Sequence, residues 1–180
     1  PFKLLVFGGS LGAQVLNETV PKALSFFDPE KRPTVVHQCG ARWVDSVAAR
    51  YKELGVKAQV VGFIDDMASA YRDSDLVICR AGATSVAELC AAGAASILVP
   101  LVVGTTSHQL GNARYMQKNG AAIMVEQPQF TPEHLFGTLM TLKREKILDM
   151  ASHARHLCRP HAAQAVADMI EHVSDLKERP

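Results

Sequence analysis

The sequence has 180 residues, 48% of them hydrophobic and 21% charged, which is the composition of one soluble globular domain. The 19 lysines and arginines nearly balance the 18 aspartates and glutamates, leaving a net charge of +1, and no basic stripe interleaved with aromatic residues occurs. This argues against a nucleic-acid partner, whereas an anionic small ligand remains compatible with the composition.

The cysteines and the apolar runs indicate the compartment. The four cysteines are far apart and form no C-x-x-C pair, a pattern typical of reduced thiols in a cytoplasmic protein. The longest apolar run, residues 93–103, contains Pro100 and is too short to cross a bilayer. The chain starts inside an expected strand, with neither a leader nor an initiator methionine, so we expect a cytoplasmic domain cut from a longer protein.

Short β-rich apolar runs alternate with longer segments of helical period. This alternation predicts an α/β domain, a Rossmann-like parallel six-stranded sheet with helices on both faces. The six strands are expected at Leu4–Phe7, Thr34–Gln38, Ala58–Val61, Leu76–Cys79, Ser96–Val99 and Ala122–Val125. Because crossovers between parallel strands are right-handed, ligands bind at the carboxyl ends of the strands, and functional residues are expected in the loops that follow them.

The C-terminal part of the chain is expected to be helical. The tripeptide 131–133, Thr-Pro-Glu, offers an N-cap, a proline at the first helical position and an acid in the first turn, which predicts a helix to about Leu142. Residues 144–175 predict two helices separated near Pro160, and residues 176–180 are expected to fray. No repeat or linker occurs, so residues 1–180 are expected to form a single domain.

The loop after the first strand, residues 8–13, reads Gly-Gly-Ser-Leu-Gly-Ala. A glycine-rich turn into a helix presents backbone N–H groups to an anion, so this loop predicts a phosphate site with Ser10, supported by Gly9 and Gly12. Two alternatives stay open. Ser10 can cap the following helix, or it can be the nucleophile of a serine hydrolase, because the loop also spells G-x-S-x-G. No histidine-bearing loop stands out to complete such a hydrolase.

A second loop of small residues, 79–87, connects the fourth strand to a helix. The N-terminus of that helix, preceded by Gly82, can receive a diphosphate. Glu88 has two interpretations: a carboxylate that accepts from the hydroxyls of a ribose, or the acid of a capping box with Ser85. The spacing alone favours the capping box.

Two more loops carry polar residues. His108 and Gln109 start a helix, where either can bond a sugar hydroxyl or simply be an exposed cap residue. The paired aspartates 65–66, after the third strand, are interpreted as a helix start. His153, His156 and His161 lie near Cys158 without an acidic partner in the same turn, so we expect surface positions, and neither a metal nor a cofactor.

These motifs, in this order and spacing, closely resemble the C-terminal half of the MurG family of bacterial cell-wall glycosyltransferases. They are Gly8 to Ala13, His37-Gln38, Phe63 to Met67, Cys79 to Ala83 continuing to Ala87-Glu88, Ala91 to Gly93, His108-Gln109 and Asn112-Ala113. The resemblance implies one half of a GT-B enzyme that transfers N-acetylglucosamine with inversion from UDP-N-acetylglucosamine to lipid-linked muramyl-pentapeptide, the step from lipid I to lipid II in peptidoglycan synthesis.

The resemblance also implies the donor site. Ser10 contacts the diphosphate, the backbone of Ile64 reads the uracil edge, and Glu88 binds the ribose, which reverses the preference for the capping box. The remaining contacts come from residues that lie against the phosphates and ribose or hold the sugar: Ala83, Thr84, Ser85, Val86, Ala87, Gln109 and His108.

No residue of this chain is expected to be catalytic, because the family's acceptor loop, catalytic histidine and membrane-contacting patch belong to an N-terminal domain that this sequence lacks. The full enzyme would be peripheral on the cytoplasmic face of the inner membrane. Thr84-Ser85 and Thr106-Ser107 depart from the family pattern, and the second pair could loosen sugar contacts. The alternative is a stand-alone UDP-sugar-binding module or scaffold without catalysis.

Overall fold

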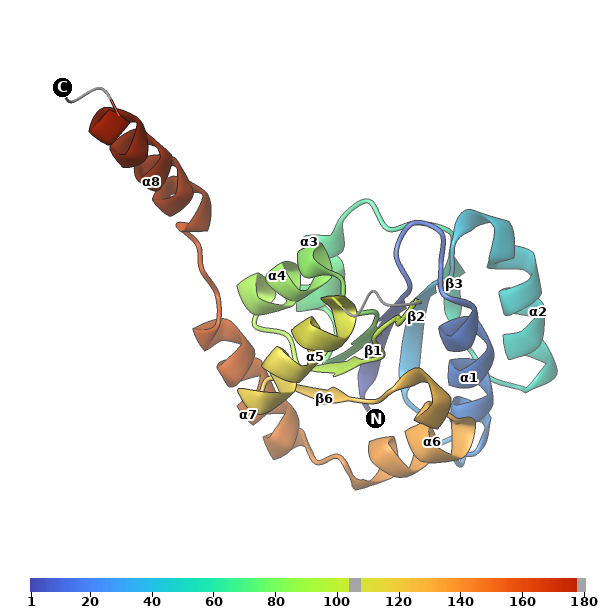
Figure 1. Ribbon diagram of the computed structural model, residues 1–180. Coiled ribbons are helices and arrows are strands. Elements are labelled where there is room, and N and C mark those ends of the chain that lie inside the picture. The colour runs from blue at the N-terminus through green and yellow to red at the C-terminus, as the bar shows by residue number, and fades with distance from the viewer. Residues whose placement is uncertain (104–107, 178–180) are drawn as a thin grey trace.

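Six parallel strands form one sheet in the computed structural model, which describes residues 1–103 and 108–177, with side chains as far as residue 172. The strand order is β3-β2-β1-β4-β5-β6 (Figure 1). The strands are β1 (Lys3–Phe7), β2 (Thr34–Gln38), β3 (Gln59–Val61), β4 (Leu76–Cys79), β5 (Ser96–Leu98) and β6 (Ala122–Met124). All six predicted strands are confirmed, and none of their ends is displaced by more than one residue.

The helices follow the strands in alternation and then continue alone. They are α1 (Gln14–Ser25), α2 (Val44–Glu53), α3 (Met67–Arg72), α4 (Ala83–Ala92), α5 (His108–Lys118), α6 (Pro132–Thr141), α7 (Arg144–His156) and α8 (Ala162–Lys177), with 3-10 turns at Ala41–Trp43 and Gln127–Gln129. The predicted N-cap of α6 is confirmed, because Thr131 Oγ1 accepts from the N–H of His134 at 3.2 Å. The break near Pro160 is also confirmed.

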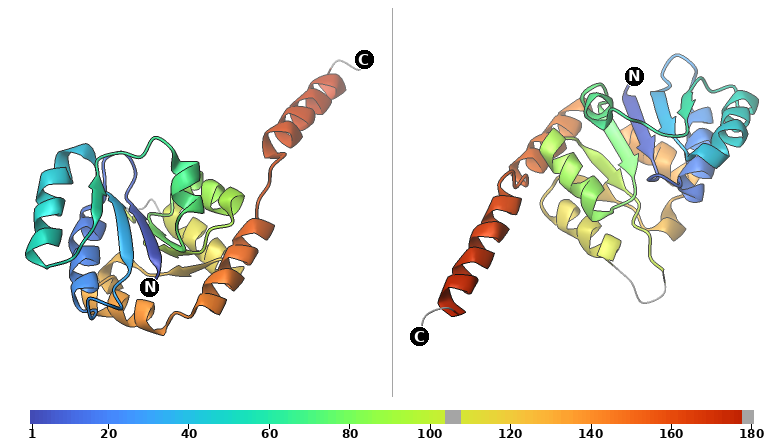
Figure 2. Two further views of the ribbon diagram at one scale, coloured as in Figure 1. Left: turned by 180° about the vertical axis from the view of Figure 1, so that it is seen from behind. Right: turned by 90° about the horizontal axis from the view of Figure 1, so that it is seen from above.

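Helices cover both faces of the sheet, as expected from side chains that alternate along each strand (Figures 1 and 2). Leu4 and Val6 of β1 point to a core shared with α1, α2 and α6, whereas Leu5 and Phe7 point to a second core shared with α3, α4 and α5. Because all six strands are parallel, their carboxyl ends meet at one edge of the sheet, and the loops that carry the predicted site residues lie at this edge.

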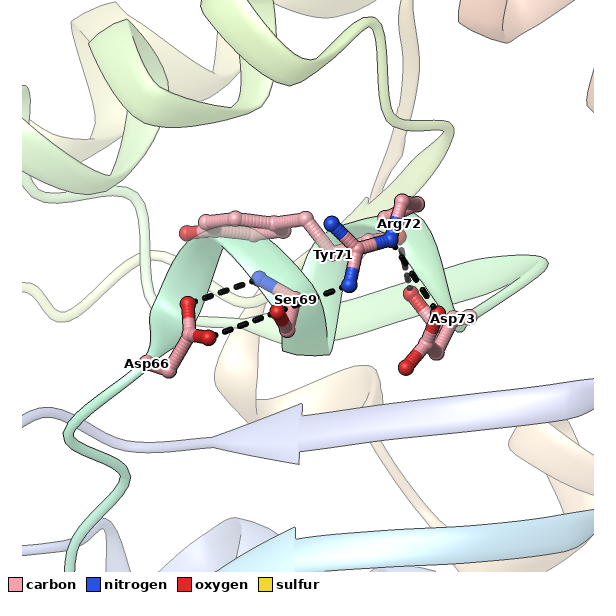
Figure 3. A network of polar contacts seen from close by, with 6 residues as sticks. Asp66, Ser69, Tyr71, Arg72 and Asp73 are labelled. Atoms are coloured by element: carbon pink, nitrogen blue, oxygen red, sulfur yellow. Dashed lines mark hydrogen bonds and ion pairs between the residues drawn. The ribbon is translucent and has the colours of Figure 1, made fainter.

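Asp66 starts α3, as the sequence predicted for the paired aspartates (Figure 3). Its carboxylate accepts from the backbone N–H of Ser69 at 2.9 Å and from the Ser69 hydroxyl at 2.6 Å. Arg72 donates to Ser69 Oγ at 2.8 Å and pairs with Asp73 at 3.4 Å. These contacts stabilise the two ends of a helix of only six residues and fix the turn that carries Tyr71.

The C-terminal helix α8 extends away from the sheet and its covering helices (Figure 2). It continues to Lys177, so the expected fraying is wrong for residues 176–177, and residues 178–180 lie outside the described part. None of the described helices is long and apolar enough to cross a membrane.

The histidines of α7 lie on the surface, as expected. His153 Nδ1 bonds the carbonyl of Asp149 at 2.9 Å, and His156 Nδ1 bonds that of Ser152 at 2.7 Å. The Asp149 carboxylate is 3.4 Å from His153, so the expected lack of an acidic partner is wrong. The i,i+4 spacing of a helix brings the two side chains together. Among the side chains of residues 1–103 and 108–172, no group of three or more metal-type side chains forms.

Candidate functional site

The glycine-rich loop between β1 and α1 turns tightly at the carboxyl edge of the sheet. The N–H of Gly12 donates to the carbonyl of Gly9 at 2.9 Å, and Gly12 has a φ of +76°. A Cβ at Gly12 would overlap the carbonyl oxygen of Cys39, in the turn after β2. The loop therefore lies directly on that turn, and only glycine fits where the two backbones meet.

Ser10 is exposed at the tip of this loop, and both alternative roles for it fail. The N-cap of α1 is Ala13, without a side-chain cap bond, so the interpretation of Ser10 as a helix cap is wrong. A nucleophile elbow strains the backbone at the serine, yet among the described residues only glycines have a positive φ. In the described part of the chain, no histidine forms a hydrogen bond with Ser10 either.

Gln38, the last residue of β2, joins two of the predicted site loops. Its Nε2 donates to the carbonyl of Gly9 and to the carbonyl of Gly62, each at 2.9 Å. The first carbonyl belongs to the glycine-rich loop, and the second belongs to the loop that carries Ile64. One buried side chain thus joins the loop that is expected to contact the diphosphate to the loop that is expected to contact the uracil.

A buried network below the glycine-rich loop supports the turn at Cys39. Asn17 Nδ2 donates to the Cys39 carbonyl at 3.1 Å, so Asn17 Oδ1 faces His37 Nε2 at 3.1 Å. An amide oxygen only accepts, so His37 Nε2 donates, and His37 Nδ1 accepts from the Tyr51 hydroxyl at 2.9 Å. Burial lowers the pKa of His37 to about 4, which keeps the imidazole neutral near pH 7.

Helix α4 begins at the same edge with unpaired N–H groups. Its N-cap is Gly82, without a side-chain cap bond, and the first intrahelical bond runs from the N–H of Val86 to the Gly82 carbonyl at 2.9 Å. Within the described residues, the N–H groups of residues 83–85 have no backbone partner. Three aligned donors at a helix N-terminus suit an anionic group.

The capping box predicted from the spacing of Ser85 and Glu88 is wrong, because Gly82 takes the cap position and places both residues inside α4. Glu88 Oε2 instead accepts from the Tyr71 hydroxyl at 2.9 Å. The cap interpretation of Glu88 is thereby removed, and the carboxylate is partly exposed.

The start of α5 ties the loop after β4 to the loop after β5. Gln109 Oε1 accepts from the N–H of Ala81 at 3.2 Å and from the N–H of Leu101 at 2.9 Å, and Asn112 Nδ2 donates to the Ala81 carbonyl at 2.9 Å. The oxygen of Gln109 is thus engaged, and its amide nitrogen is the group that can donate to a ligand. His108 is exposed, and Thr106-Ser107 lies outside the described residues.

A cavity of about 330 Å³ lies between the glycine-rich loop and the N-terminus of α4. It is lined by Gly8, Gly9, Gly12, Ala13, Gln14, Arg80, Gly82, Ser85, Leu101 and Gln109. Arg80 donates to the Val99 carbonyl at 3.1 Å, and although burial lowers its pKa, a guanidinium keeps its charge in proteins. Arg80 belongs to one of the family motifs, but the sequence did not predict that its side chain lines this cavity.

The structure does not bring all the predicted site residues to this cavity. Glu88 lines a groove of about 720 Å³ between α3, α4 and α7. Ile64 lines a hollow of about 690 Å³ on the sheet face that the short α3 leaves uncovered. Ser10, Thr84, Ala87 and His108 are exposed, and Val86 is partly buried against the second core.

The parallel sheet, its strand order and the glycine-rich turn at its carboxyl edge define a Rossmann-like domain, a class of fold that binds nucleotides at this edge. The glycosyltransferase family 28 C-terminal domain matches residues 3–173. Because that match covers nearly the whole chain, the chain belongs to this family, and it is the C-terminal domain of a GT-B arrangement.

Relatives and solved structures agree with this assignment. The UDP-N-acetylglucosamine–N-acetylmuramyl-(pentapeptide) pyrophosphoryl-undecaprenol N-acetylglucosamine transferase of Aromatoleum aromaticum is 52% identical over 97% of this chain and 49% of its own length. That of Methylibium petroleiphilum is 54% identical over 95% of this chain and 47% of its own length. The chain thus spans about half of these relatives.

A crystal structure of Acinetobacter baumannii MurG superposes with a TM-score of 0.88 at 40% identity, covering 96% of this chain and 52% of that one. The resemblance to the MurG family that the motifs indicated is therefore confirmed. The glycosyltransferase VinC, solved with dTDP, has a TM-score of 0.63 at 19% identity over 95% of this chain and 41% of its own, and shows the fold alone.

Proposed function

We propose that this chain is the donor-binding domain of an inverting transferase that moves N-acetylglucosamine from UDP-N-acetylglucosamine to lipid-linked muramyl-pentapeptide in peptidoglycan synthesis. The observation that carries the proposal is the cavity at the sheet edge, where free N–H groups of α4 meet the glycine-rich loop and Arg80. Relatives about half identical to this chain carry the name of that transferase.

The donor would extend from this cavity along α4. Its diphosphate would lie against Ser10 and the N–H groups of residues 83–85. Glu88 is five residues after Ala83, about 7 to 8 Å along the helix, which suits a ribose attached to that diphosphate. Within the described residues, the backbone N–H and carbonyl of Ile64 make no hydrogen bond, which leaves a donor and an acceptor for a uracil edge.

Leaving-group stabilisation is the chemical task of this domain in the proposal. When the acceptor hydroxyl attacks the anomeric carbon, negative charge develops on the β-phosphate. The α4 N–H groups and the Arg80 guanidinium would stabilise that charge electrostatically. We propose that this field makes a bound metal unnecessary, so that EDTA leaves the affinity for UDP unchanged.

The catalytic histidine and the acceptor site would come from an N-terminal domain, and the whole enzyme would work peripherally on the cytoplasmic face of the membrane. Without that domain we expect weak donor binding and no turnover. The rival proposal, a stand-alone UDP-sugar-binding module, predicts that fusion to the N-terminal half of the Aromatoleum aromaticum relative restores no transfer even though UDP still binds.

Calorimetry with UDP-N-acetylglucosamine, ADP-glucose and GDP-mannose tests the nucleotide assignment. We expect heat of binding with the uridine sugar alone, because the two backbone groups of Ile64 match a pyrimidine edge. Equal affinity for a purine sugar would contradict the proposal.

A further inference from the structure

Tyr71 is a buried tyrosine that lies between two parts of the proposed donor site. Its hydroxyl donates to Glu88 Oε2 at 2.9 Å, and its ring packs edge-on against Phe7, with centroids 6.0 Å apart at 79°. Phe7 is the last residue of β1 and is followed at once by the glycine-rich loop. One side chain of α3 therefore contacts both the proposed ribose-binding carboxylate and the strand that carries the proposed diphosphate loop.

The Glu88 carboxylate depends on this contact for its orientation. Glu88 lies in the middle of α4, and its side chain has three rotatable bonds. Within the described residues, the Tyr71 hydroxyl is its one hydrogen-bond partner, since neither an ion pair nor a backbone donor reaches it. A free glutamate on a helix surface populates several rotamers, and a fixed donor selects among them.

Tyr71 is itself held firmly. It is 5% exposed and belongs to the second core. The hydrogen bonds of Asp66 also stabilise the short helix that carries it (Figure 3). Burial, and secondarily the hydrogen bond to Glu88, raise the pKa of Tyr71, so the hydroxyl stays protonated and donates. The bond therefore has a fixed direction, from the phenol to Oε2, which leaves Oε1 and one lone pair of Oε2 for a ligand.

We propose that Tyr71 is a positioning residue that aims the Glu88 carboxylate at the ribose hydroxyls, and that the pair sets a preference for ribonucleotides over 2′-deoxyribonucleotides. This inference rests on the proposed function, because it assumes that UDP binds along α4. The phenol touches no ligand in this arrangement. Its effect is to keep Glu88 in the rotamer that accepts from the diol.

The variant Tyr71→Phe removes only the hydroxyl and keeps the ring against Phe7. Affinities for UDP and for 2′-deoxy-UDP are measured by calorimetry on the wild type, Tyr71→Phe, Glu88→Ala and the double variant, with melting temperature as a check of folding. Tyr115→Phe is the matched control, because Tyr115 lies on α5 and is 48% exposed. We expect Tyr71→Phe to reduce the preference for UDP over 2′-deoxy-UDP roughly three- to tenfold.

Three further results are expected. The affinity for 2′-deoxy-UDP changes little in Tyr71→Phe, the control keeps the wild-type preference, and Tyr71→Phe has no additional effect in the Glu88→Ala background. Equal weakening of both nucleotides, or a preference that Tyr71→Phe leaves intact while Glu88→Ala removes it, overturns the role of Tyr71 and leaves the proposed function standing. A wild type that fails to bind UDP, or that does not distinguish the two sugars, overturns the ribose assignment and this inference with it.

Discussion

Replacing Gly12 by alanine tests whether the glycine-rich loop needs its contact with the turn at Cys39. The φ of Gly12 is +76°, a region that costs an L-residue with a side chain about 1–2 kcal/mol. The added Cβ would also overlap the Cys39 carbonyl, and such overpacking typically costs about 1–3 kcal/mol. Together these give a loss of about 2–5 kcal/mol in the free energy of unfolding.

Urea unfolding measures this loss, and Gly55→Ala separates its two parts. Gly55 has a φ of +64°, and a Cβ there would meet nothing within 4 Å, so only the backbone strain of about 1–2 kcal/mol remains. Gly12→Ala should also weaken UDP binding, because the loop must move, whereas Gly55→Ala should not. Equal destabilisation by the two substitutions would refute the claim that the loop rests on the Cys39 turn.

Three other predictions follow from the site. Ser10→Ala should weaken UDP by about 1.5–3 kcal/mol and leave uridine unaffected, since a hydroxyl bonded to a charged phosphate is lost; equal calorimetric losses for both would move Ser10 away from the phosphates. Glu88→Gln should lower UDP affinity by about 1–3 kcal/mol with little change in melting temperature, and an unchanged affinity would exclude Glu88 from the ribose. The pKa of His37 is about 4 in the folded protein against the usual 6.5, so between these two pH values only the unfolded chain takes up a proton at His37. The free energy of unfolding should therefore fall by about 3 kcal/mol as the pH is lowered from 6.5 to 4. Urea unfolding across that range should show a smaller loss for His37→Gln, and an identical loss would mean that His37 titrates normally in the folded state.

The sheet could be predicted from sequence because each strand contains a short apolar run, and segments of helical period separate these runs. Leu76–Cys79 is buried at every position, so its hydrophobicity alone marks a central parallel strand. The cap of α6 could also be predicted, because Thr131 and Pro132 act on neighbouring backbone groups. Local signals of this kind need no knowledge of the tertiary fold.

The errors at the site have one physical origin. The spacing of Ser85 and Glu88 fits a capping box, but that pattern also occurs inside a helix, and here Gly82 takes the cap. The hydrogen-bond partner of Glu88 is instead Tyr71, 17 residues earlier, and no local sequence pattern predicts a contact between two helices. The bonds from Gln109 Oε1 to backbone groups of two other loops are long-range in the same way, whereas the contact of Gln109 with a sugar stays a prediction.

Amide chemical-shift mapping with UDP tests the central claim most directly, because predicted site residues line three separate hollows and we place the diphosphate in the one between the glycine-rich loop and α4. We predict that the largest shifts occur at Ser10, Gly12, Ile64 and Ala83, and that ADP does not reproduce them. Shifts concentrated instead at Thr34 and Gln59 on the open sheet face, or at Leu148 and Ala151 on α7, would contradict the account.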